Sequence, residues 1–331
     1  MLQIGIVGMG GIGNNHARCY AANENAKVVA VCDMVKEQAD KAAASYETQA
    51  FYSVEEMIAS GLRLDACSVT TAGVENGGDH YEPTMALLRA GIPVLGEKPI
   101  SNEIPKAREM VALAAEKQLP YGINLNHRFT PAAVKAKEWL TNGRLGELQI
   151  VNMTMWINNP NESSPWFHIR ALHPHSLDVM SYFAGGVDRV HAFFKKGKGR
   201  QIWSNVQANL LYENGVIGHL TGSYDAGGSY GLETLELVGS EGRVIINEAC
   251  EKLTFYPRFS REIESYDHLG GMGGFADTFP ARINAWIDDL LNQVPPAQVD
   301  AKGADALRVQ LVIEALIESW ETGQVVKVPP R

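Results

Sequence analysis

The chain has 331 residues, of which 45% are hydrophobic and 20% charged, and this average composition excludes a disordered chain, collagen and a coiled coil. Its 29 basic and 38 acidic side chains give a net charge of −9, which argues against nucleic acid and anionic membranes as partners. No segment reaches the roughly 18 apolar residues of a membrane span. The four cysteines are widely spaced without a C-x-x-C pair. We therefore expect two domains in a cytoplasmic protein with reduced thiols.

The first 124 residues alternate between short β-branched runs and helical patterns. This alternation predicts an N-terminal domain over residues 1–124 that is built on a doubly wound parallel sheet with helices on both faces. The expected strands are 3–7, 27–32, 66–69, 92–95 and 121–124, and the expected helices are 13–22, 36–45, 83–90 and 103–117.

Alternating strand patterns dominate the remaining residues, 125–331. The expected strands are 148–156, 190–194, 203–212, 215–222, 233–238 and 243–247, with helices at 131–141, 174–183 and 304–320. Asn214-Gly215 is a strong hairpin signal, and a glycine cluster at 270–274 predicts a mobile loop. We expect an α/β domain with a large open, mostly antiparallel sheet for substrate binding and oligomerisation, whose last helix can pack back on the first domain.

A glycine-rich turn at residues 8–13 follows the first expected strand and opens the first expected helix. It fits G-x-G-x-x-G through Gly8, Gly10 and Gly13, which serve the tight turn, the close approach of a pyrophosphate and the contact between helix and strand. Asp33 ends the second strand, where a carboxylate accepts hydrogen bonds from the adenosine ribose. A plain glycine turn with a capping aspartate is the alternative.

The residues after Asp33 are Met34 and Val35, neither of which neutralises a 2′-phosphate. The sequence therefore predicts NAD as the cofactor, preferred over NADP.

Lys98 lies in Gly96-Glu97-Lys98-Pro99, just beyond strand 92–95. Ligands of open parallel sheets bind past the carboxyl ends of the strands, so topology places Lys98 near the cofactor. Its ammonium group suits a substrate hydroxyl on which alkoxide charge develops. The alternative is a solvated lysine before a turn proline.

Several stretches together resemble the glucose-fructose oxidoreductase / inositol dehydrogenase / MocA family. They are the turn 8–13 with His16-Ala17, residues 80–91 leading into Glu97-Lys98-Pro99, the segment His175-Ser176-Leu177-Asp178 with Gly185 downstream, residues 143–147 and the closing helix. The resemblance implies a Rossmann domain, a second domain whose open sheet makes oligomer contacts, and oxidation or reduction of sugars or cyclitols with a nicotinamide cofactor. It also implies a cis peptide bond between Lys98 and Pro99.

Motif and resemblance together define the expected sites. The cofactor-binding residues are Gly8, Gly10, Gly11, Ile12, Gly13, Asp33, Thr70, Thr71, His80, Glu97 and Lys98. The substrate-binding residues are Lys98, Trp156, Trp166, His168, Arg170, His175 and Asp178, with Lys98 and His175 catalytic and no metal.

His175 is the expected general acid/base, because an imidazole that titrates near neutrality can accept the hydroxyl proton. Asp178, one helical turn on, either orients this ring or packs within the helix. Many family members have an aspartate four residues before the histidine, but this chain has Ala171. The usual pairing of carboxylate and imidazole is therefore missing.

The segment around Ala171 holds other polar and aromatic side chains. Arg170 suits an anionic group on the substrate, or else a surface salt bridge. His168 and His173 supply substrate contacts or, with His175, metal ligands, although no cysteine or second carboxylate stands at ligand spacing. Trp156 and Trp166 offer faces for sugar C–H surfaces, or else pack in the core.

A second departure from the family is the loop 71–79, where Thr71-Ala72-Gly73 replaces Thr-Pro-Asn. We expect this loop to reshape the nicotinamide or substrate side of the site.

These features predict an NAD-dependent dehydrogenase that oxidises a secondary hydroxyl of a sugar, sugar derivative or cyclitol. One alternative is a redox-neutral NAD-dependent glycosidase that acts through a transient keto-sugar, for which the missing carboxylate leaves room. Another is a non-catalytic dinucleotide sensor that binds a partner protein. The open sheet face predicts a homodimer or homotetramer.

Overall fold

The computed structural model describes residues 1–226, 232–247 and 251–330. The chain divides into two compact units, one made of residues 1–125 and 279–307, the other of residues 126–278 and 308–331. The first unit therefore includes residues 279–307 as well as the expected 1–124, whereas the sequence led us to expect only the last helix to return to the first domain. Cys250, one of the four cysteines, lies outside the described residues.

The first unit holds a six-stranded parallel sheet in the order β3-β2-β1-β4-β5-β6. This is the strand order of the Rossmann fold, so the predicted doubly wound sheet is confirmed. The strands are β1 (Leu2–Val7), β2 (Ala26–Cys32), β3 (Gln49–Phe51), β4 (Ala66–Val69), β5 (Val94–Gly96) and β6 (Tyr121–Ile123). The short edge strand β3 was not predicted.

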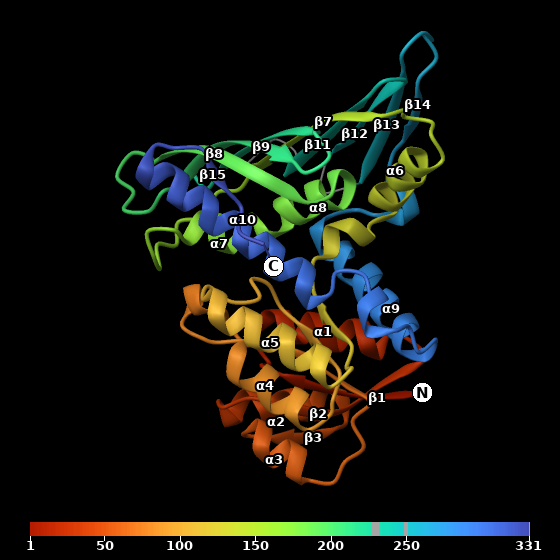
Figure 1. Cartoon of the computed structure of the whole chain (residues 1–331). Helices are drawn as coiled ribbons and strands as arrows, with labels where there is room; N and C mark the ends of the chain where they lie inside the picture. The colour runs from red at the N-terminus through yellow and green to blue at the C-terminus, as the bar shows by residue number, and fades with distance from the viewer. Residues whose placement is uncertain (227–231, 248–250, 331) are drawn as a thin grey trace. The chain divides into compact units, whose positions relative to one another are not determined.

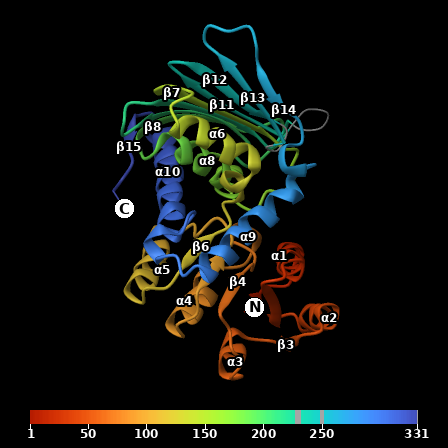
Figure 2. The same cartoon turned by 90° about the vertical axis from the view of Figure 1, so that its right-hand side faces the viewer.

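Helices cover both faces of this sheet, and Figure 2 shows α1 and α2 on one side and α4 and α5 on the other. They are α1 (Gly11–Ala21), α2 (Lys36–Tyr46), α3 (Val54–Ala59), α4 (Tyr81–Arg89), α5 (Ile104–Glu116) and α9 (Thr278–Leu291). Ile283, Trp286 and Ile287 of α9 are fully buried in one hydrophobic cluster with Ile4 and Tyr20. This packing explains why a late segment belongs to the first unit, which sequence periodicity did not reveal.

The second unit holds a nine-stranded sheet in the order β14-β13-β12-β11-β7-β10-β9-β8-β15. Only the pair β10 and β7 is parallel among the described pairings, which confirms the mostly antiparallel prediction. The strands are β7 (Leu148–Trp156), β8 (Val187–Lys195), β9 (Asn205–Tyr212), β10 (Ile217–Ser223), β11 (Glu233–Gly239), β12 (Gly242–Asn247), β13 (Lys252–Pro257), β14 (Glu264–Tyr266) and β15 (Val326–Lys327). Strands β13 to β15 were not predicted.

Helices α6, α8 and α10 gather on one face of this sheet (Figure 1). The helices of the unit are α6 (Pro131–Thr141), α7 (Phe167–Ala171), α8 (Pro174–Ala184) and most of α10 (Gly303–Thr322), with the short 3-10 helix η2 (Asn126–Phe129) ahead of them. Along β9, Val206, Ala208 and Leu210 are buried while Gln207 and Asn209 are exposed. One face of the sheet is therefore core and the other carries polar side chains.

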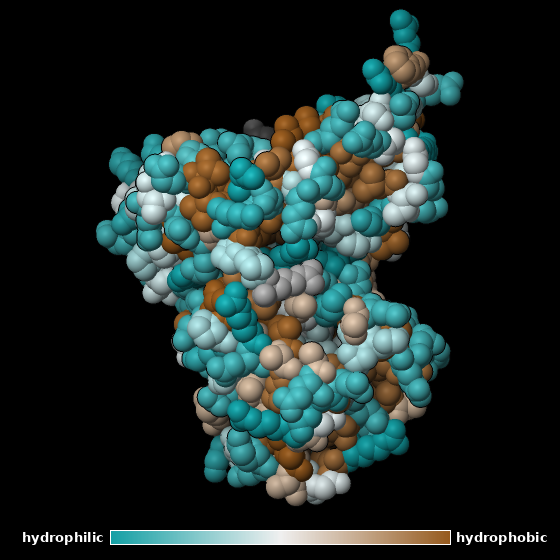
Figure 3. All heavy atoms as spheres, viewed as in Figure 1, coloured by the Kyte–Doolittle hydropathy of each residue, from teal (hydrophilic) through white to brown (hydrophobic). Residues whose placement is uncertain are grey.

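The surface in Figure 3 is mostly hydrophilic on both units, as the charged fraction of the sequence implies. Within the described part of the chain, every helix is too short or too polar to span a bilayer. The glycine cluster at 270–274 contributes to a 3-10 turn, η3 (Leu269–Gly271), and leads into η4 (Phe275–Asp277); its mobility stays a prediction.

Candidate functional site

The shape of the glycine turn between β1 and α1 is set by close contacts between backbone atoms. Gly8 has a φ of +93°, and a Cβ there would lie 2.5 Å from the backbone nitrogen of Thr71. A Cβ on Gly13 would lie 1.9 Å from the carbonyl oxygen of Gly8, whereas one on Gly10 or Gly11 would meet nothing within 4 Å. Gly8 and Gly13 are thus required by close packing, and Gly10 and Gly11 leave open space at the N-terminus of α1.

Asp33 follows β2 and is tied to this turn. Its Oδ2 accepts a hydrogen bond from the Met9 amide at 2.7 Å, and its Oδ1 accepts one from the Val35 amide at 2.8 Å. Each carboxylate oxygen can accept a further bond. Asp33 is half-buried beside the turn, and Ile12 in the first turn of α1 is 39% exposed.

Thr70 and His80 connect the loops that follow β1, β4 and β5. The Thr70 hydroxyl donates to the carbonyl oxygens of Val7 and Gly8 at 3.0 and 2.7 Å. The ring nitrogens of His80 lie 3.0 Å from the Thr71 carbonyl oxygen and 2.8 Å from that of Pro99. The first unit therefore brings the expected cofactor residues together at the carboxyl edge of its sheet.

Loop 71–79, which differs from the family pattern, also lies at the carboxyl edge of the parallel sheet. The Thr71 hydroxyl donates to the Asp79 carbonyl oxygen at 2.7 Å, and a 3-10 turn, η1 (Val74–Asn76), lies between them. Glu75 is buried and accepts from the Asn102 amide at 2.9 Å. The loop is held at both ends, and its effect on a substrate stays a prediction.

Glu97 and Lys98 follow β5, and the Lys98-Pro99 bond is cis, as the resemblance implied. Glu97 accepts from the Asn124 amide at 2.6 Å and lies 3.1 Å from His16 Nε2. Burial raises the pKa of Glu97, but these partners and Lys98 outweigh it and hold the pKa below its usual value. Burial lowers the pKa of Lys98, and the Glu97 charge offsets part of that effect. His16 belonged to the resembling motif, but no role had been predicted for it.

His175 lies in the first turn of α8 and is buried. Its ring stacks on that of His127, with centroids 4.6 Å apart and planes inclined by 13°. His127 Nδ1 lies 3.1 Å from Glu233 Oε2. His127 and Glu233 were missed by the sequence analysis, because they are 48 and 58 residues from His175 along the chain and neither stands in a motif.

Asp178 pairs with Arg128, and both side chains are buried. Arg128 Nε donates to Asp178 Oδ2 at 2.9 Å, and its Nη2 donates to Oδ1. The carboxylate therefore serves this ion pair, which the sequence analysis did not foresee. Its expected contact with substrate stays a prediction.

His168 and His173 form a buried pair, with their Nε2 atoms 3.0 Å apart. Burial lowers the pKa of His168 to about 3 and that of His173 well below 6.5. Arg170 makes two hydrogen bonds to Glu314, at 3.0 and 2.9 Å. This is the salt bridge that the sequence left open as the alternative to a substrate contact.

The two expected aromatic contacts differ in their surroundings. Trp166 stacks on Trp203 at 5.9 Å and meets the edge of Phe194 at 5.1 Å, in a cluster that Trp320 completes. Trp156 ends β7 and is half-buried. Trp166 is therefore part of an aromatic cluster of the second unit, and a sugar contact by either ring stays a prediction.

Metal-ligating side chains are scattered in the structure. Over residues 1–226, 232–247 and 251–330, no three His, Cys, Asp or Glu side chains are grouped to hold a metal ion.

Comparison with known proteins adds to this geometry. Residues 2–125 match the model of an oxidoreductase family with an NAD-binding Rossmann fold, and residues 133–245 match a GFO/IDH/MocA C-terminal domain. The chain is 25% identical to an inositol 2-dehydrogenase of Saccharopolyspora erythraea over 99% of this chain and 95% of that protein. It is 30% identical to the D-glucoside 3-dehydrogenase of Escherichia coli over 45% of this chain and 42% of that protein.

Among solved structures, the fold is similar to that of a levoglucosan dehydrogenase in complex with NADH and levoglucosan. The TM-score is 0.86 at 20% identity, and the match covers 99% of this chain and all of that one.

Proposed function

The chain belongs to the GFO/IDH/MocA family of NAD-binding oxidoreductases, and from this we propose that it oxidises a secondary hydroxyl group of a sugar, sugar derivative or cyclitol. One observation carries the proposal. At the carboxyl edge of the parallel sheet, the glycine turn follows β1, Asp33 follows β2, Thr70 follows β4 and Lys98 lies just after β5, and these four strands are neighbours in the sheet. An NAD site at this edge has an amine beside it that suits a substrate hydroxyl.

The residues present fit NAD. Gly10 and Gly11 leave open space at a helix N-terminus, where backbone N–H groups and the helix dipole favour a pyrophosphate. Asp33 keeps lone pairs for ribose hydroxyls, and its negative charge opposes a 2′-phosphate. When bound, NAD supplies the hydride acceptor. We therefore propose NAD over NADP, and equal kcat/KM with the two coenzymes would overturn this preference.

Lys98 and His175 are the proposed catalytic residues. Oxidation breaks the C–H and O–H bonds of the substrate carbinol and forms a C=O bond. We assign the hydroxyl proton to a ring nitrogen of His175, and a hydrogen bond to the reacting oxygen to Lys98 Nζ. Burial lowers the pKa of Lys98, which makes its ammonium group a stronger donor to the reacting oxygen.

The test is an NAD-reduction screen over cyclitols, hexoses, uronic acids and glycosides with the whole chain. We expect NADH to accumulate with at least one of them. Lys98→Ala and His175→Ala should each lower kcat by about a hundredfold or more. Because the two residues lie in different units, the double variant is informative: a loss much smaller than the product of the two single losses places both in one step. No NADH from any compound contradicts the proposal.

A redox-neutral glycosidase is the second candidate, favoured by Ala171 in place of an acidic residue. In that reaction, transient oxidation next to the anomeric carbon acidifies a C–H bond and permits elimination of the aglycone. Release of product from a glycoside without NADH accumulation, lost when NAD is removed, would select this reading.

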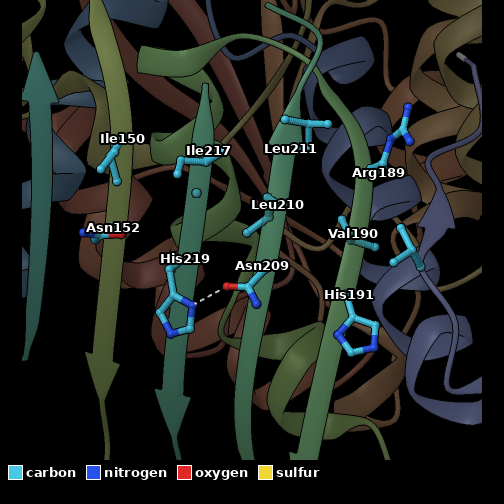
Figure 4. Close-up of a pocket in the computed structure, with 12 residues that line it drawn as sticks. Ile150, Asn152, Arg189, Val190, His191, Asn209, Leu210, Leu211, Ile217 and His219 are labelled. Carbon is cyan, nitrogen blue, oxygen red and sulfur yellow. Dashed lines mark hydrogen bonds between the residues drawn. The ribbon is translucent and has the colours of Figure 1, made fainter. Parts of the chain in front are cut away.

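The face of the nine-stranded sheet opposite its helices is the proposed oligomer contact. Figure 4 shows side chains of β7 to β10 that line a hollow on this face. The volume of the hollow is about 390 Å³. Ile217 is 52% exposed, and His219 lies 2.8 Å from the Asn209 side chain. Exposed apolar and imidazole groups on an open sheet face suit a second copy of the chain.

Light scattering tests this contact. We expect a dimer or tetramer for the wild type and a smaller species for Ile217→Lys. Val134→Lys is the matched control, because Val134 is 50% exposed on α6. A monomeric wild type contradicts the contact.

A further inference from the structure

Three buried side chains of the second unit form a cluster of two stacked imidazole rings and one carboxylate, which we call the histidine stack. The sequence motifs did not predict it. His127 comes from η2, His175 from the first turn of α8, and Glu233 from the start of β11. Their exposed fractions are 1%, 4% and 3%. The two rings lie face to face with centroids 4.6 Å apart, and the Glu233 carboxylate lies 3.1 Å from His127 Nδ1 on the far ring.

The neighbouring residues hold the two rings in this arrangement. The Thr130 hydroxyl donates to the His127 carbonyl oxygen at 2.9 Å, which fixes the turn that carries His127. Phe275 meets both rings by its edge, at 5.9 Å from His127 and 6.2 Å from His175. The two histidine rings are buried, whereas Phe275 covers them from a position that is 39% exposed.

His175 needs such support because the carboxylate expected four residues earlier is replaced by Ala171. An imidazole that accepts a proton becomes a cation, and burial disfavours a cation without an anionic or aromatic neighbour. We propose that Glu233, acting through His127, positions His175 and stabilises its protonated form. This inference rests on the proposed role of His175 as the proton acceptor.

The stack supplies that support in two ways. The contact between Glu233 and His127 is close but lacks the angle of a hydrogen bond, so the carboxylate acts through its charge. A negative charge 3.1 Å from Nδ1 attracts the proton of neutral His127 to that nitrogen and polarises the ring to be electron-rich. The face of an electron-rich ring attracts a cation placed over it. A neutral His127 therefore stabilises a protonated His175, whereas two protonated rings would repel each other.

Within the second unit, the other charged groups near His175 largely cancel or are neutral. Arg128 of η2 and Asp178 of α8 form an ion pair with each other. The pKa of His173 on the same helix is lowered by burial, so this ring is neutral near pH 7.

The remaining elements that pack nearby bring few charges. Strand β7 presents the apolar Met153 and Met155 to the core, and in α7 His168 pairs with His173 while Arg170 pairs with Glu314. Asp277 follows Phe275 and accepts from the Gly273 amide at an exposed position. Glu233 is therefore the carboxylate that we expect to influence His175.

The first test measures the pKa of His175 by NMR in the whole chain without NAD or substrate, with its resonance assigned by His175→Gln. Glu233→Gln should lower this pKa by about one unit, because a nearby negative charge is lost. Glu233→Asp should restore most of it. Glu236→Gln is the matched control on β11, since Glu236 bonds Asn152 and should leave the pKa unchanged. An unchanged pKa in folded Glu233→Gln overturns the inference.

A second measurement needs no substitution. In wild-type protein labelled with ¹⁵N-histidine, the ring nitrogen shifts identify the tautomer of neutral His127. We expect the proton on Nδ1, and a proton on Nε2 with a bare Nδ1 contradicts the inference.

Activity provides a third readout once a substrate is known. In Glu233→Gln, the acid limb of kcat/KM should move to lower pH by the same amount as the His175 pKa. A limb that stays in place contradicts the inference. Because the NMR tests use no substrate, they can fail while NADH is still formed, and they can succeed when none is formed.

Discussion

The glycine turn of the first unit and the histidine stack of the second unit are built in opposite ways. The turn is made by consecutive residues, and its precision comes from backbone atoms that leave no space for a side chain at Gly8 or Gly13. The stack is made by side chains from three separate segments, held by burial and ring contacts. At Gly8 and Gly13 the turn has no space for an added side chain, whereas the stack depends on keeping each charge and each ring partner.

The buried ion pair beside the stack gives the largest expected effect. Asp178→Ala leaves Arg128 buried without this partner, and should reduce the free energy of unfolding by about 3 to 5 kcal/mol. Urea denaturation measures this loss. Arg63→Ala in the first unit is the control, because Arg63 is 76% exposed in its pair with Asp65 and should change stability by less than about 1 kcal/mol. Equal losses of unfolding free energy in Asp178→Ala and Arg63→Ala would contradict the expected difference between the buried and the exposed ion pair.

The glycine turn gives the next largest effect. Gly13→Ala forces a Cβ against the Gly8 carbonyl oxygen and should cost about 1 to 3 kcal/mol of stability. Gly11→Ala is the matched control in the same turn, where the new methyl group meets nothing, so stability should stay within about 0.5 kcal/mol. Thermal unfolding without coenzyme separates the two. An unchanged stability in Gly13→Ala would contradict the prediction, because the backbone at Gly8 would then have moved to make room for the new methyl group.

Acid should destabilise the two units in different pH ranges. The pKa of His168 is about 3 in the folded chain and 6.5 in the unfolded chain. Between these pH values the unfolded chain binds a proton at His168 and the folded chain does not, so acid favours unfolding. Stability of the second unit should fall by about 1 kcal/mol per pH unit as pH drops from 6.5 toward 4. The pKa of Glu97 is lowered from 4.5, so its contribution in the first unit is lost only below about pH 4.5.

Amide hydrogen exchange at pH 7.0 and 5.5 resolves the two units. We expect faster exchange in β9 and β10 at the lower pH and little change in β1 and β4, after correction for intrinsic rates. His168→Gln should reduce this difference. Equal acceleration of all four strands would be the contrary result.

The order of the amino acids was sufficient for the framework of the chain. Continuous apolar strands, glycines at fixed spacing and alternating patterns are local signals, and they located the Rossmann sheet, the glycine turn beside Asp33 and most strands of the open sheet. Edge elements such as β3 and β15 were missed because three or two residues carry too little periodicity. Helix α9 was missed although its buried face is apolar, and its place in the first unit follows from contacts with β1 and α1.

The tertiary structure alone decided which side chains meet. Sequence reasoning placed His175 and Asp178 one turn apart on the same helix, but it could not show that Asp178 binds Arg128 or that His175 stacks on His127. These contacts join residues dozens of positions apart, and their energy depends on distance and burial, which no local pattern records. Local patterns fix elements because neighbours along the chain share one backbone; charge and ring partners are fixed only when the sheet and its helices close around them.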